Sequence, residues 1–262
     1  MGGIDKSLNI LDAVANGGKS RLKVDSRALL LTTIIYLGIM LSVATSHVDI
    51  LLWFALYPIV ASPTLGLTYL KVFLQSLIVL PLVILLGVFN PIIDKTPVAS
   101  LDGLVITQGW LLFIGIILRG LLSMQALLLL INSIGFTGIV SAMSRLGVPK
   151  FIVVQLLMVF RYIRVLIEEG AAMKRARDAR SFGRKNLSIK MWGILIGQLF
   201  LRSMGRAERI HKAMLARGFD GEMPVNFSSR TKWNMTSSVY LIMWTILFVF
   251  LRLFNLSLLF VE

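Results

Sequence analysis

The sequence predicts an all-α protein, a polytopic integral membrane protein with about five transmembrane helices and a basic cytoplasmic module of helices. Three observations predict this class. The 262-residue chain is 56% hydrophobic, and its mean hydropathy is +0.82. Only 15% of its residues are charged, whereas about a quarter are charged in a typical soluble domain. The apolar residues gather in long runs, and most of the positive charge lies in one segment between the last two runs.

Five apolar runs are candidate membrane spans. The first has 19 uncharged residues, or about 28 Å of helix, which is close to the roughly 30 Å of a hydrocarbon core. The basic segment before it has no apolar core, so we interpret it as something other than a cleavable signal peptide. The five runs are 28–46, 50–67, 72–89, 104–134 and 233–260.

Two of these runs are irregular. Pro58 and Pro63 interrupt the second run, which we therefore interpret as a broken or re-entrant span. The fourth run is too long for one straight span and carries Arg119, so we expect a bend or overhang near Arg119 and Gly120. A cation at membrane depth is often functional, but a residue that snorkels at a helix bend is the simpler interpretation.

The basic residues predict the orientation. The segment 145–232 carries 18 of the 27 Lys and Arg residues against six acids. Because positive residues collect in cytoplasmic loops, this segment and the N-terminus are expected in the cytoplasm of a multi-pass protein of the inner (plasma) membrane. The predicted organisation is a cytoplasmic segment at 1–27, transmembrane helices at 28–144, a cytoplasmic module at 145–232 and a last transmembrane helix at 233–262.

The cytoplasmic module contains an internal repeat. Each half opens with an apolar stretch of about 15 residues, which is short for a span, and then becomes basic. The two basic ends align as MKRARDARSF (173–182) and IHKAMLARGF (210–219), so that Arg180 matches Arg217. A repeat of this kind suggests two equivalent contacts with a partner. The alternative is that both arginines are ordinary solvated cations on the cytoplasmic side.

The repeat also predicts helix geometry. Positions 173, 176 and 180 fall on one helical face. Gly183 and Gly218 stand where the two helices are expected to end.

No catalytic, cofactor or metal site is expected in this chain. It has no cysteine, and its two histidines, His47 and His211, fall on opposite sides of the membrane in this topology, whereas transition-metal sites usually need three or four ligands. Glu168 and Glu169 have no histidine partner. Because Arg164 precedes Glu168 by four residues, an intrahelical ion pair is the simpler account. Walker A and G-x-S-x-G patterns are also missing from the sequence.

The paired Ala-Arg motifs, with the FDGEMP run at 219–224, resemble those of the transmembrane T component of energy-coupling factor transporters. The likeness is closest to the CbiQ branch, which serves cobalt and nickel uptake, and runs at 4–31 and 145–169 extend it to nearly the whole chain. The motif residues are Ala179, Arg180, Ser181, Ala216, Arg217 and Gly218.

The resemblance implies a coupling subunit of an ABC importer in the lipid bilayer. Such a subunit bridges two cytoplasmic ATPase subunits (CbiO-like) to a substrate-binding membrane subunit (CbiM/CbiN-like). Arg180 and Arg217 would each insert into a groove on one ATPase, and the coupling helices would pass the ATP-driven movement to the substrate-binding subunit. No nucleic acid is implied as a partner.

Three alternatives stay open. One is a T component for a vitamin-type substrate, since the likeness of the run 218–224 to the metal branch rests on few residues. A membrane-embedded enzyme with a basic cytoplasmic face would need converging acids or histidines. A membrane anchor for nucleic acid would need aromatics among the basic residues, where only Phe182, Trp192 and Phe219 stand. Co-purification of ATPase subunits would separate the coupling subunit from the last two.

Overall fold

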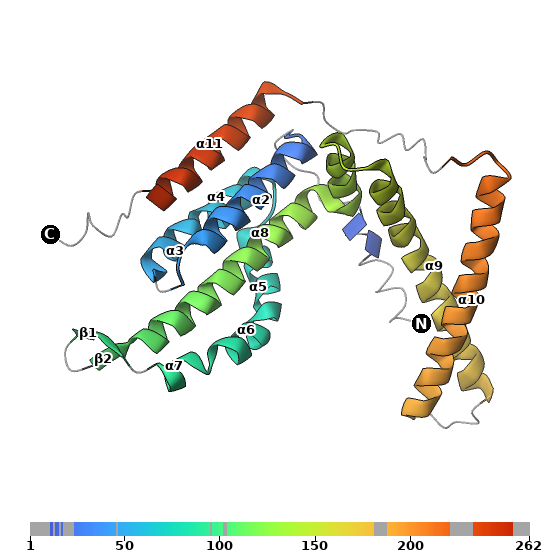
Figure 1. Ribbon diagram of the computed structural model, residues 1–262, viewed down its shortest axis with the longest axis horizontal. Coiled ribbons are helices and arrows are strands. Elements are labelled where there is room, and N and C mark those ends of the chain that lie inside the picture. The colour runs from blue at the N-terminus through green and yellow to red at the C-terminus, as the bar shows by residue number, and fades with distance from the viewer. Residues whose placement is uncertain are drawn as a thin grey trace. The chain divides into compact units, whose positions relative to one another are not determined.

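The computed structural model confirms the all-α class (Figure 1). It describes residues 11–12, 14–15, 17, 24–45, 47–94, 96–101, 104–180, 188–220 and 233–253, with the side chains of 93 and 97–106 excepted. One short antiparallel hairpin, β1 (Pro97–Leu101) with β2 (Leu104–Thr107), accompanies the helices. The helices are α2 (Ser26–Ser42), α3 (Val48–Phe54), α4 (Leu56–Thr64), α5 (Tyr69–Ser76), α6 (Leu80–Gly87), α7 (Asn90–Ile93), α8 (Gln108–Arg145), α9 (Lys150–Arg180), α10 (Ile189–Leu215) and α11 (Met235–Leu253), with a 3-10 turn, η1 (Leu77–Val79), between α5 and α6.

The chain forms two compact units. The membrane unit comprises residues 14–142 and 229–262, and the helix-pair unit comprises residues 1–13 and 143–228. Within the described residues, three helical segments are long and apolar enough to cross a membrane, and two apolar helical segments are shorter. These segments make the chain a membrane protein. The longer ones are Tyr69–Ile92, Gln108–Arg145 and Met235–Leu253, and the shorter ones are Ser26–Ser42 and Val48–Thr64.

The core of the membrane unit is a cluster of aromatic rings. Helix α2 packs most extensively on α11, and the rings of α3 and α4 join them. The ring centroids of Tyr36 and Tyr57 lie 4.6 Å apart, those of Tyr57 and Trp244 4.9 Å, and those of Tyr36 and Phe248 5.2 Å. All of these side chains are at most 2% exposed. Each such pair adds about 0.5–1.5 kcal/mol beyond the burial of its area.

The second predicted span is broken, as expected from its prolines. The helix stops at Ala55, between α3 and α4. In a continuous helix the Phe54 carbonyl would accept from the backbone of residue 58, but Pro58 has no N–H to donate. The Tyr36 hydroxyl donates to that carbonyl instead, at 3.2 Å. A side chain of α2 therefore satisfies the backbone group that the proline leaves open.

The prediction of a bend near Arg119 and Gly120 is wrong. Helix α8 runs through both residues, and its break lies at Gly135, where φ is +67° and ψ is 173°. Only glycine adopts this conformation readily. Gly120 serves close packing, because an added Cβ would come within 2.6 Å of the Val83 side chain on α6. The predicted fourth run also starts too early, since its first four residues form β2.

Arg119 contacts the end of α2. Its guanidinium donates to the carbonyl of Val43, the residue that follows the last turn of that helix. Arg252 of α11 donates to the neighbouring carbonyl of Ser42 at 3.4 Å. The last carbonyls of a helix have no partner within the helix and carry partial negative charge. Two arginines from different helices therefore stabilise the C-terminal end of α2, and the expected snorkelling at a bend does not describe Arg119.

Candidate functional site

The helix-pair unit is built on α9 and α10, which run antiparallel (Figure 1). Helix α10 begins after Ser188, whose side chain accepts from the backbone N–H of Met191 at 3.3 Å, as N-cap serines do. Its last residue is Leu215, and Gly218, in the left-handed region with φ +78°, lies in the turn that terminates it. The N–H of Phe219 donates to the Met214 carbonyl at 3.0 Å across this turn. The helix end predicted at Gly218 is confirmed, and Gly183 lies outside the described residues.

The motif residues lie at the ends of these helices. Ala179 and Arg180 close α9, and Ala216, Arg217 and Gly218 follow the last turn of α10. All five are exposed, and Ser181 lies outside the described residues.

The two motif arginines lie at opposite ends of the helix pair. Arg180 borders a groove with Met191, at the start of α10. Arg217 stands 26 residues further along that helix, which corresponds to about 39 Å at 1.5 Å per residue. The pair thus presents one exposed Ala-Arg motif at each end.

Two grooves lie along the helix pair. The first has a volume of about 770 Å³ and is lined by α9 from Val165 to Arg180 and by α10 from Met191 to Arg206. The predicted face is confirmed, because Met173, Ala176 and Arg180 all line this groove. The second, of about 690 Å³, is lined mainly by apolar side chains near the start of α9 and the end of α10.

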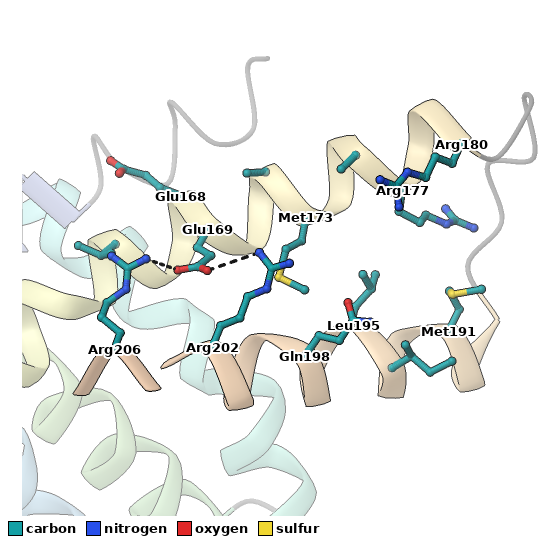
Figure 2. Close-up of a pocket in the computed structure, with 14 residues that line it drawn as sticks. Glu168, Glu169, Met173, Arg177, Arg180, Met191, Leu195, Gln198, Arg202 and Arg206 are labelled. Carbon is teal, nitrogen blue, oxygen red and sulfur yellow. Dashed lines mark hydrogen bonds and ion pairs between the residues drawn. The ribbon is translucent and has the colours of Figure 1, made fainter. Parts of the chain in front are cut away.

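A charged cluster joins the helices within the first groove (Figure 2). The Glu169 carboxylate of α9 accepts from Arg206 of α10 at 2.6 Å and lies 3.8 Å from Arg202. The Glu169 side chain is 16% exposed. We call Glu169, Arg202 and Arg206 the clasp. The ion pair expected between Arg164 and Glu168 is wrong, because Arg164 pairs with Asp12 instead.

Sequence reasoning missed the clasp because it considered neighbours within one helix. A signal for it was present in the basic pair Arg202 and Arg206, which are four residues apart and therefore share a face of α10. An acid on the antiparallel helix was the expected complement of that face.

The histidines lie in different units. His47 precedes α3 in the membrane unit, and His211 lines the second groove. Among the residues that the structure describes, no group of three or more His, Cys, Asp or Glu side chains is placed to hold a metal ion.

Comparison with known proteins gives a family. The model of the cobalt transport protein family CbiQ matches residues 19–233. The nickel permease LarQ of Lactiplantibacillus plantarum is 29% identical over 119 residues, which are 45% of this chain and 43% of that protein. The cobalt transport protein CbiQ of Salmonella typhimurium is 26% identical over 106 residues, 40% of this chain and 47% of that protein. CbiQ of Rhodobacter capsulatus is 31% identical over 88 residues, 33% of this chain and 36% of that protein.

The matched segments span less than half the length of each of these relatives. The family model, in contrast, covers most of the chain. Together with helices long enough to cross a membrane, this match shows that the chain belongs to the CbiQ family of cobalt transport proteins, whose members are membrane transporter components.

Proposed function

We propose that this chain is the transmembrane coupling subunit of an energy-coupling-factor ABC importer. It transmits ATP hydrolysis from two cytoplasmic ATPase subunits (CbiO-like) to a substrate-binding membrane subunit (CbiM/CbiN-like). The observation that carries the proposal is the placement of two matching Ala-Arg motifs at opposite ends of one antiparallel helix pair. Two copies of one motif suit two copies of one kind of partner.

The chemistry of the motifs supports docking at acidic grooves. Arginine presents five N–H donors in a planar fork, which binds carboxylates in bidentate geometry. The preceding residues, Ala179 and Ala216, are small and exposed, so a partner surface reaches the helix end closely. The long helices behind the motifs, of 31 and 27 residues, are stiff enough to carry a displacement away from the docking point.

The transported substrate in this proposal is cobalt or nickel. Family membership and the names of the relatives, cobalt transport protein and nickel permease, support a metal ion over a vitamin. The ion is bound by the separate membrane subunit. The helix pair lies on the cytoplasmic side of the inner membrane, because most of the Lys and Arg residues belong to it.

Co-purification tests the proposal. The ATPase subunits encoded with this chain are expected to bind it, and Arg180→Glu with Arg217→Glu together is expected to abolish binding. Truncating one partner of a buried, paired charge costs about 2–5 kcal/mol, and both anchors are then lost. Lys190→Glu, an exposed charge change of the same sign on α10, is the matched control. Normal complex yield from the double variant would contradict the proposal.

A further inference from the structure

The internal repeat has a register that extends beyond its motifs. Arg180 aligns with Arg217, an offset of 37 residues. The same offset aligns Glu169 with Arg206, and these two side chains bond each other at 2.6 Å. When two copies of a unit contact each other at equivalent positions, the contact lies on the two-fold axis that exchanges them. The clasp therefore marks a pseudo-two-fold axis of the helix pair.

The residues that line the two grooves follow the same exchange in part. Val165 and Arg206 line both grooves, as expected for residues beside the axis. Away from the axis, three apolar residues of the first groove have their repeat equivalents in the second, whereas the equivalents of Ala172, Ala176 and Ile194 do not line it. The corresponding pairs are Met191 with Val154, Leu195 with Met158, and Met173 with Ile210.

The contact between Glu169 and Arg206 forms because these two equivalent residues carry opposite charges. In a perfect repeat the two positions would carry the same charge, and like charges at this distance repel. The two copies of the repeat instead differ here in sign, with Glu169 in the first and Arg206 in the second. Arg202 adds a second guanidinium on the other carboxylate oxygen.

Little side-chain burial accompanies the contact between α9 and α10 in the described part of the chain. Among the described residues of α9 only Val153 is buried, and none of α10 is. Beside the clasp the helices approach closely, because a Cβ added at Gly170 would lie 3.6 Å from the Leu199 side chain. The Glu169 carboxylate is largely removed from water, so its ion pairs are screened less than ordinary surface pairs.

We infer that Glu169 and Arg206 are positioning residues, a clasp on the pseudo-two-fold axis that makes α9 and α10 act as one crossed lever with two equal arms. Each motif arginine stands eleven residues beyond its own member of the clasp, or about 16 Å of helix. Displacement of one motif is then passed to the other helix through the clasp. The lever action rests on the proposed function, whereas the crossing is a property of the chain alone.

A distance measurement in the purified chain tests the crossing. The sequence has no cysteine, so spin labels at Arg175→Cys and Lys190→Cys report on the helices at one side of the axis. The wild-type background should give a narrow distance distribution, and Glu169→Gln a broader one. Glu169→Arg should broaden it further, because three arginines then meet. The exchanged pair, Glu169→Arg with Arg206→Glu, should restore the narrow distribution. Equal widths in all four backgrounds would overturn the clasp.

Transport in the assembled complex tests the lever. Glu169→Gln should keep the ATPase subunits bound, because both motifs are intact, and should lower metal uptake per ATP hydrolysed severalfold. The exchanged pair should recover uptake, which a general loss of folding would not do. Glu208→Gln and Arg209→Gln, exposed on α10, are matched controls expected to keep the wild-type ratio. A wild-type chain that binds no ATPase would remove the proposed function, whereas an unchanged uptake ratio in Glu169→Gln with normal binding would overturn the lever alone.

Discussion

Different interactions stabilise the interior of each of the two units of this protein. In the membrane unit, rings from four helices pack in a cluster that excludes solvent. In the helix-pair unit, Val153 is the only buried side chain among the described residues of α9 and α10, and the charged clasp joins the two helices. A packed aromatic core resists deformation, whereas a few ion pairs between long helices permit a change of crossing angle. The comparison suggests a rigid membrane unit and a helix pair whose crossing angle can change.

The largest expected effect breaks the aromatic core. Phe248→Ala removes a ring that is 1% exposed and contacts four other rings. We expect a loss of about 3–5 kcal/mol in the free energy of unfolding, since the cavity adds to the lost burial. Thermal and denaturant unfolding in detergent would measure it.

The matched change in the other unit is Phe200→Ala. This α10 ring is 60% exposed, so its removal should cost less than about 0.5 kcal/mol. Similar losses from the two substitutions would contradict the contrast between the units.

The next effect concerns the arginines at the end of α2. Arg119→Met keeps much of the volume but removes the donor to the Val43 carbonyl. We expect a loss of about 1.5–3 kcal/mol, the range for hydrogen bonds to charged groups. Arg119→Lys should recover part of it, because lysine keeps the positive charge at the helix end. Unfolding of the three proteins in parallel would test this, and full stability of the Met variant would exclude a capping role.

A smaller effect is expected at the break in α8. Gly135→Ala forces a side chain into a backbone conformation used almost only by glycine, at a cost of about 1–3 kcal/mol. Gly38→Ala is the control, since Gly38 is helical with open space around it. It should be neutral or stabilise α2 by up to about 1 kcal/mol. A loss in the free energy of unfolding for Gly135→Ala, together with no loss or a gain for Gly38→Ala, would confirm that Gly135 fixes the break.

The smallest effect concerns the hydroxyl that compensates for Pro58. Tyr36→Phe keeps the ring in the aromatic cluster and removes the donor to the Phe54 carbonyl. We expect a loss of about 0.5–1.5 kcal/mol, the usual net value of one hydrogen bond. The second variant, Tyr36→Phe with Pro58→Ala, should recover most of it, because residue 58 then has an N–H for that carbonyl. No recovery in unfolding measurements would mean that the hydroxyl acts elsewhere.

Patterns that depend on one segment were predictable from the sequence. The prolines of the second run predicted a broken span, the repeat placed Met173, Ala176 and Arg180 on one face, and Gly218 marked a helix end. Hydropathy located the membrane helices, because it depends only on composition along the chain.

Features that depend on tertiary packing were not predictable in this way. Gly120 and Gly135 look alike in sequence, yet one packs against Val83 and the other breaks the helix. Nothing local separates these uses. Likewise, the spacing of Arg164 and Glu168 favoured an ion pair within α9, whereas the antiparallel arrangement of the helices brings Glu169 to Arg206.

The length of α2 has a consequence for the surrounding lipid. Its 17 residues make about 26 Å of helix, whereas α8 has about 40 Å of helix before its break at Gly135. A bilayer core of about 30 Å matches neither length, so we expect α8 to tilt, whereas α2 is short and has its last carbonyls satisfied by the two arginines. Such hydrophobic mismatch costs fractions of a kcal/mol per Å. Acyl-chain length should therefore tune the stability of the membrane unit.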